Sequence, residues 1–149
     1  MENGASTSPV LINRQEDRVP TGINGLDNLV EGGFPRGSLI LLAGSPGSGK
    51  TIASAQYVYH GVSNLGETGI YISFGERKSV FYENMKKFGL DFEQLESTGR
   101  FKFLDMLTPG SYKHSIDTLN MALKEIQSLK TQRLVIDSFS AMSLAFDRK

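Results

Sequence analysis

The sequence predicts an α/β domain built on a mostly parallel β-sheet, and three observations support this fold class. Apolar runs of strand length alternate with helical segments along most of the chain. The first such run, Leu-Ile-Leu-Leu-Ala over residues 39–43, is apolar on both faces, as expected of a buried parallel strand. A glycine-rich loop over residues 44–49 then leads directly into a helical segment. Together these features favour a parallel sheet flanked by helices.

Three further strands are expected after the first one. They are the apolar and aromatic runs over residues 69–74, 101–106 and 133–138. The last of them reads Arg-Leu-Val-Ile-Asp-Ser and carries the acidic residue Asp137 near its end. The intervening length leaves room for two or three strand–helix units, after which we expect the chain to return beside the first strand.

The helices are predicted from apolar residues at helical spacing. We expect them over residues 26–30, 51–63, 79–89 and 114–130. The third could stack its aromatic residues on nucleic-acid bases. The spacing of Phe81, Met85 and Phe88 instead favours packing in the core, with Gly89 closing the helix. The fourth carries one apolar stripe: Ile116, Leu119, Leu123, Ile126 and Leu129.

The composition is that of one ordinary globular domain. The chain has 149 residues, which we divide into a flexible N-terminal tail over 1–17 and one folded domain over 18–149. The 16 Lys and Arg residues balance 16 Asp and Glu residues. The chain therefore lacks the excess of basic residues that a nucleic-acid-binding domain usually carries. There is no cysteine, which excludes disulfides and a thiol nucleophile.

Targeting and membrane segments are not evident. The N-terminus has neither a basic region nor an apolar core of the signal-peptide type. No apolar run reaches the length of a membrane span. A cytoplasmic protein is therefore expected.

The sequence Ala-Gly-Ser-Pro-Gly-Ser-Gly-Lys-Thr over residues 43–51 predicts a phosphate-binding loop, the Walker A motif. A loop between a strand and a helix N-terminus directs several backbone N–H groups and the helix dipole at one point, where phosphate binds. Lys50 would reach the β- and γ-phosphates, and Thr51 would bind Mg²⁺. An ordinary glycine-rich surface turn is the alternative, which the strand–loop–helix context disfavours. The predicted nucleotide-binding residues are Gly44, Ser45, Pro46, Gly47, Ser48, Gly49, Lys50 and Thr51.

Asp137 is the candidate for a second metal-binding residue. It stands at the end of an apolar strand, and a bound Mg²⁺ needs a carboxylate, which can act through a water molecule. A simple polar strand end is the alternative interpretation. The phosphate-binding loop favours a metal role, so ATP and Mg²⁺ are the predicted cofactors.

The run Thr-Gly-Ile-Asn-Gly-Leu-Asp, followed by residues 28–51, resembles the opening of KaiC-like ATPases in the RecA/RadA superfamily. The segments Gly-Ile-Tyr-Ile-Ser-Phe-Gly-Glu-Arg and Arg-Leu-Val-Ile-Asp-Ser-Phe-Ser-Ala-Met follow in the family's order, so the resemblance covers roughly residues 18–145. It implies a RecA-like P-loop NTPase core that binds ATP or ADP with Mg²⁺. It also implies a homo-oligomeric ring or filament, with nucleotide between neighbouring subunits.

Two departures from the family pattern bear on hydrolysis. KaiC-like domains usually carry Phe-Glu-Glu after the second strand, whereas this chain has Phe74, Gly75 and Glu76. Glu76 is therefore the one candidate general base at that place, the alternative being a helix-start acid favoured by the dipole. Family domains also continue for several strands after the one ending at Asp137. The chain thus resembles a form truncated after the Walker B strand, with a sheet incomplete at its C-terminus and an edge that invites pairing.

The sequence leaves three functions open. The first is a KaiC-like regulatory ATPase with slow, assembly-coupled hydrolysis. The second is a DNA-recombination accessory of the RadA-paralogue kind, against which the balanced charge weighs. The third is a nucleotide-binding signalling module that changes protein partners without significant hydrolysis, an interpretation favoured by the missing carboxylate.

Overall fold

The computed structural model describes residues 18–106 and 112–146. The predicted tail over 1–17 lies outside the described residues. The strands are β1 (Arg18–Val19), β2 (Phe34–Pro35), β3 (Gly69–Ser73), β4 (Phe101–Asp105) and β5 (Arg133–Asp137). The helices are α1 (Leu26–Leu29), α2 (Lys50–Asn64), α3 (Lys78–Lys86), α4 (Phe92–Ser97), α5 (Tyr112–Leu129) and α6 (Phe139–Phe146).

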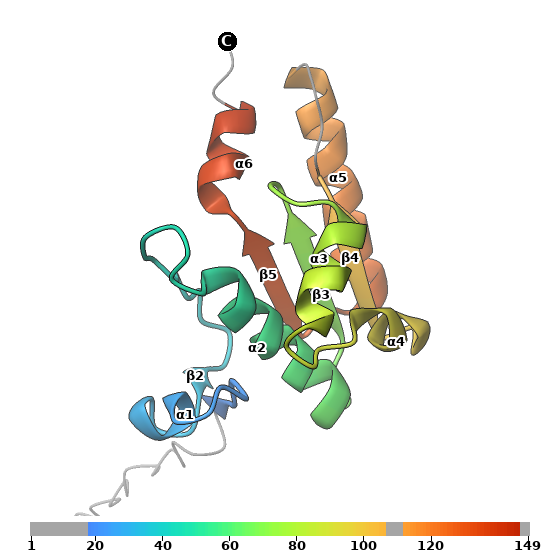
Figure 1. Ribbon diagram of the computed structural model, residues 1–149. Helices are drawn as coiled ribbons and strands as arrows, with labels where there is room; N and C mark the ends of the chain where they lie inside the picture. The colour runs from blue at the N-terminus through green and yellow to red at the C-terminus, as the bar shows by residue number, and fades with distance from the viewer. Residues whose placement is uncertain (1–17, 107–111, 147–149) are drawn as a thin grey trace, which may run out of the picture.

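A parallel three-stranded sheet in the order β4-β3-β5 forms the centre of the fold (Figure 1). All five residues of β3 are buried, which explains why this strand is apolar on both faces. Ser73 at its carboxyl end pairs with Asp105 on β4 and with Asp137 on β5. The three carboxyl ends therefore meet at one edge, where ligands bind in open α/β sheets.

Helices cover both faces of this sheet, giving three layers (Figure 1). On one face α2, α3 and α4 enclose an aromatic core in which Tyr71 stacks on Phe103, and Phe81 packs against both rings. On the other face α5 supplies Ala122, with Ile126 and Leu129 packed beside it. This architecture confirms the predicted α/β class with a parallel sheet flanked by helices.

The prediction of a buried strand over residues 39–43 is wrong. The structure gives this segment no strand hydrogen bonds, and the side chains of Leu39 and Leu41 are 98% and 78% exposed. The segment does not form a strand because it is separated from β5 by a cavity that both of them line. The expected pairing between them therefore does not form. An apolar run identifies a segment suited to burial, but burial also requires a neighbouring strand.

Two expectations about apolar helix faces are also wrong. Leu119 and Leu123 of α5 are exposed, and the face buried against the sheet carries Ala122, Ile126 and Leu129. On α3, Phe81 and Met85 are buried as expected, but Phe88 lies beyond the helix end and is 57% exposed. The α5 error arises because residues three and four apart share a helix face, so the pattern alone leaves two adjacent faces possible. The α3 error arises because the helix ends at Lys86, before Phe88.

The signature over residues 21–27 forms a clamp that fixes the N-terminal segment to α2. Asp27 Oδ1 accepts hydrogen bonds from the amide and hydroxyl of Thr21 at 2.8 and 2.7 Å, and Thr21 is fully buried. Gly22 has a φ of 71° and leaves no room for a Cβ beside the His60 ring, while its carbonyl accepts from Gln56 of α2 at 2.9 Å. These signature residues are therefore explained by packing.

Candidate functional site

The loop over residues 44–49 joins the exposed segment to α2. Gly49 directly precedes the helix with a φ of 87°, and Gly47 has a φ of 78°. Both lie in the left-handed region, which is readily open to glycine and strained for most other residues. Gly44 and Ser48 approach closely, since a Cβ on Gly44 would meet the Ser48 hydroxyl at 2.7 Å. The loop is solvent-exposed and ends at the N-terminus of a 15-residue helix, a site that favours anions.

Lys50, the first residue of α2, folds back over this loop. Its Nζ donates to the carbonyl oxygens of Gly44 at 2.9 Å and Ser45 at 2.8 Å. The ammonium group is thereby held against the concave side of its own loop. A phosphate group there would be a stronger partner for it than two neutral carbonyls, because it adds the attraction between opposite full charges.

Thr51 and Asp137 meet although they are 86 residues apart in the sequence. The Thr51 hydroxyl donates to Asp137 Oδ2 at 2.7 Å, which ties the start of α2 to the carboxyl end of β5. The predicted metal-binding pair is therefore brought together by the fold. Hydroxyl and carboxylate oxygens are the ligand types that Mg²⁺ prefers, so the donor set fits this cation.

This pair is not a dedicated protein cage for a metal. Among the described residues, no group of three or more His, Cys, Asp or Glu side chains could hold a metal ion. A Mg²⁺ bound at Thr51 and Asp137 would accordingly need phosphate and water oxygens to complete its coordination, the usual arrangement for this ion in nucleotide sites.

Tyr71 is a third member of the site, which sequence reasoning missed. Its hydroxyl donates to the same Asp137 Oδ2 at 2.7 Å, from the strand next to β5. The Tyr71 side chain is fully buried, and burial together with the nearby Asp137 carboxylate raises the pKa of Tyr71 well above its usual range. It therefore remains a neutral donor. The sequence did contain one indication of this contact. A tyrosine in a buried strand has a hydroxyl group that needs a hydrogen-bond partner.

Glu76 lies in the turn after β3, at the same edge of the sheet. Its amide donates to the Ser73 hydroxyl at 3.0 Å, and its Oε1 accepts from Asn84 Nδ2 of α3 at 2.9 Å. Phe74 N donates to the Asp137 carbonyl at 2.7 Å, which joins the start of this turn to the end of β5. Gly75, beside it, is exposed.

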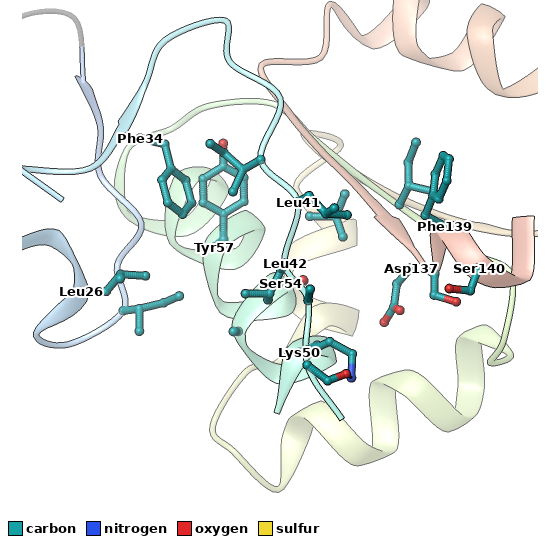
Figure 2. Close-up of a pocket in the computed structure, with 18 of the residues that line it drawn as sticks. Leu26, Phe34, Leu41, Leu42, Lys50, Ser54, Tyr57, Asp137, Phe139 and Ser140 are labelled. Atoms are coloured by element: carbon teal, nitrogen blue, oxygen red, sulfur yellow. The ribbon is translucent and has the colours of Figure 1, made fainter. Parts of the chain in front are cut away.

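A cavity of about 550 Å³ lies behind the loop, between residues 40–44, α2 and the end of β5. Figure 2 shows Leu41 facing Phe139 across it, with Lys50 and Asp137 near one end. Its walls are mainly apolar, and the polar residues that line it include Lys50, Ser54 and Asp137. Lys50 and Asp137 both line this cavity, and among the described strands β5 pairs on one side only, with β3.

Comparison with known proteins identifies the family. Residues 19–149 match a family model described as "ATPase: KaiC". The chain belongs to the KaiC family of ATPases. This confirms the resemblance drawn from the sequence, and the KaiC-family fold explains the phosphate-binding loop, the parallel sheet and the acidic strand end as parts of one RecA-like P-loop core.

Relatives from several organisms share most of this KaiC-family chain. It is 34% identical over 141 residues to the UPF0273 protein PH0284 of Pyrococcus horikoshii, covering 84% of this chain and 56% of the relative. It is 32% identical over 145 residues to a circadian clock oscillator protein KaiC of Prochlorococcus marinus, covering 91% of this chain and 28% of that protein.

A solved structure supports the same fold. The KaiC-like protein PH0186 of Pyrococcus horikoshii superposes with a TM-score of 0.78 at 35% identity, covering 87% of this chain and 57% of that one. The chain thus spans little more than half the length of the UPF0273 and KaiC-like relatives it matches. Within the described residues, no helix has the length and apolar character needed to cross a membrane.

Proposed function

We propose that residues 18–149 bind ATP and ADP with Mg²⁺ and hydrolyse ATP slowly, in step with assembly into a ring or filament. One observation carries the proposal: the Thr51–Asp137 hydrogen bond brings a loop hydroxyl and a strand-end carboxylate to one point. That point lies at the start of the helix that carries Lys50. Anion-binding and cation-binding groups then face the same small volume.

The loop and Lys50 bind the phosphates in this proposal. Backbone N–H groups between Gly44 and Thr51 would bind phosphate oxygens, and the Lys50 ammonium would exchange the two carbonyls it now contacts for phosphate oxygens. Thr51 and Asp137 would hold Mg²⁺, whose positive charge offsets that of the phosphates. Tyr71 orients Asp137 through the shared Oδ2.

Glu76 is the proposed general base. Its carboxylate accepts a proton from water as the water oxygen bonds to the γ-phosphorus and the bond to the ADP oxygen breaks. Slow hydrolysis follows from Gly75, which stands where KaiC-like domains place a second carboxylate. Coupling to assembly is supported by the exposure of residues 44–48, which a neighbouring subunit can cover. A regulatory role is supported by the similarity to a clock oscillator protein.

The test combines a titration with a slowly hydrolysed ATP analogue and a single-turnover ATPase assay. Lys50→Ala should weaken binding roughly tenfold or more, because a charge-assisted contact contributes about 1.5–3 kcal/mol. Glu76→Gln should lower turnover by roughly 10²–10⁴ to a residual rate while leaving binding intact. Unchanged affinity in Lys50→Ala would contradict the proposed site, and a wild-type turnover of about 10 s⁻¹ would contradict slow hydrolysis. Single-stranded DNA should change the rate little; a salt-sensitive rise would favour the recombination alternative.

A further inference from the structure

We infer that Asn84 on α3 is a positioning residue for Glu76, holding one carboxylate oxygen so that the other stays directed at the attacking water. This inference rests on the proposed function of Glu76 as general base. The contact that carries it is the hydrogen bond from Asn84 Nδ2 to Glu76 Oε1 at 2.9 Å.

The orientation of the Asn84 amide is fixed from both ends. Its Oδ1 accepts a hydrogen bond from Lys87 Nζ at 3.2 Å, while its Nδ2 donates to Glu76. A flipped amide would place its NH₂ group against an ammonium and its oxygen against a carboxylate, which reverses both interactions. The hydrogen-bond network therefore defines which atom of Asn84 faces Glu76.

The backbone on each side of this contact is anchored. Asn84 stands on α3 next to Met85 and one turn after Phe81, whose side chains are 3% and 1% exposed. The turn that carries Glu76 is held by the bond from its amide to the buried Ser73 hydroxyl. Asn84 and Glu76 are both half-buried, so the amide–carboxylate bond is less exposed to competing water than a surface pair.

A general base works only when its free oxygen is aimed at the proton it accepts. No described group is bonded to Glu76 Oε2, whereas Oε1 is taken by Asn84. An unrestrained glutamate at the end of a strand samples several rotamers, and Gly75 supplies no second carboxylate to replace it. Asn84 thus provides the restraint that a single base requires.

The experiment measures kcat, KM and analogue affinity for Asn84→Ala, Asn84→Asp and the control Glu83→Ala. Glu83 precedes Asn84 on α3, is exposed, and pairs with the same Lys87, so it tests disturbance of that lysine alone. We expect kcat to fall roughly tenfold in Asn84→Ala, a fraction of the 10²–10⁴ that general-base catalysis contributes. The loss should be larger in Asn84→Asp, where like charges repel. KM and affinity should stay unchanged.

A double-mutant cycle distinguishes positioning from simple support of the fold. In the Glu76→Gln background, Asn84→Ala should cause no further loss of rate, because the group it positions is already inactive. The inference about Asn84 would be overturned if the two substitutions reduced kcat additively, or if Asn84→Ala reduced kcat no more than Glu83→Ala does. Neither result would affect the assignment of Glu76 as general base. If wild type turns over no faster than Glu76→Gln, the assignment of Glu76 as base fails, and the inference about Asn84 fails with it.

Discussion

The hydroxyl of Tyr71 donates to Oδ2 of Asp137 at 2.7 Å, across the junction between β3 and β5. The same oxygen accepts from Thr51, so two hydroxyl groups restrain one side of the carboxylate. One of them comes from the phosphate-binding loop and the other from the aromatic core. These two hydrogen bonds therefore restrict the conformations that the Asp137 side chain can adopt.

Tyr71→Phe should weaken nucleotide binding in the presence of Mg²⁺ by roughly three- to tenfold, the effect of losing one hydrogen bond worth about 1 kcal/mol. Affinity measured in EDTA should be unchanged, since Tyr71 acts through Asp137. Tyr59→Phe is the matched control, because Tyr59 is a half-buried tyrosine that packs edge-on against Phe92 in the same core. Equal losses with and without Mg²⁺ would show that Tyr71 acts on the fold and not on the cation.

The limits of sequence reasoning are visible in these residues. Strands β3, β4 and β5 were predicted within one residue, because their apolar runs were bounded by polar and glycine residues. The loop and Asp137 were found as motifs, although their chemical roles remain predictions. Tyr71 and Asn84 could not be assigned, since their partners lie 66 and 8 residues away and depend on strand register and helix rotation.

Short elements were missed for a different reason. Helix α4, the β1–β2 pair and α6 have too few residues for a reliable period, and α4 depends on one cap, where Asp91 accepts from the amide of Gln94 at 3.0 Å. Residues 39–43 show the opposite failure, a strong pattern without a strand beside it. Local sequence reports what a segment is suited to bury, and tertiary context decides whether it does.

The exposed apolar segment predicts dye binding and self-association. Leu41 and Ile136 line the cavity, and both are exposed, as are their neighbours Leu39 and Leu134. The chain should bind an apolar fluorescent dye and associate as its concentration rises. Leu39→Lys with Leu41→Lys should reduce both signals without lowering the unfolding midpoint. Leu29→Lys, at a site 82% exposed on α1, is the control and should change neither. If the double variant still binds the dye, the apolar surface that binds it does not include Leu39 and Leu41.

The Asp27 clamp predicts a pH-dependent stability. Partial burial opposes ionisation, but hydrogen bonds from Thr21 and the Gly22 amide outweigh it and lower the pKa of Asp27. A lowered pKa means that the folded state favours the ionised carboxylate. The resulting stabilisation is complete above the unfolded-state pKa of about 4 and is lost as pH falls below it.

Asp27→Asn should therefore lower the urea midpoint at pH 7 and flatten its decline between about pH 5 and pH 3. The control is Asp117→Asn, which alters an exposed aspartate on α5. If the urea midpoints of the wild type and of Asp27→Asn fall in parallel down to pH 3, the role given to this carboxylate is contradicted.

Among the described residues Arg133 is the most buried charged side chain. The missing Cβ of Gly61 leaves the space that this side chain occupies. The Arg133 side chain is 0% exposed, pairs with Glu67, and donates to the carbonyl oxygens of Pro20 at 2.8 Å and Tyr57 at 2.9 Å. It therefore joins β5, α2 and the N-terminal segment. A Cβ on Gly61 would lie 2.0 Å from Nε of Arg133, well inside contact distance.

Gly61→Ala is expected to destabilise the protein although it replaces glycine by the best helix former. Helix propensity alone would stabilise α2 by about 1 kcal/mol. The new methyl group, however, displaces Arg133 from its partners, and breaking a buried ion pair costs about 3–5 kcal/mol. The second effect is larger, so the unfolding midpoint should fall, and cleavage by protease near residues 18–37 should increase. Ser63→Ala, at an exposed position two residues along α2, isolates propensity and should stabilise slightly. A Gly61→Ala variant as stable as Ser63→Ala would show that Arg133 can move aside at little cost.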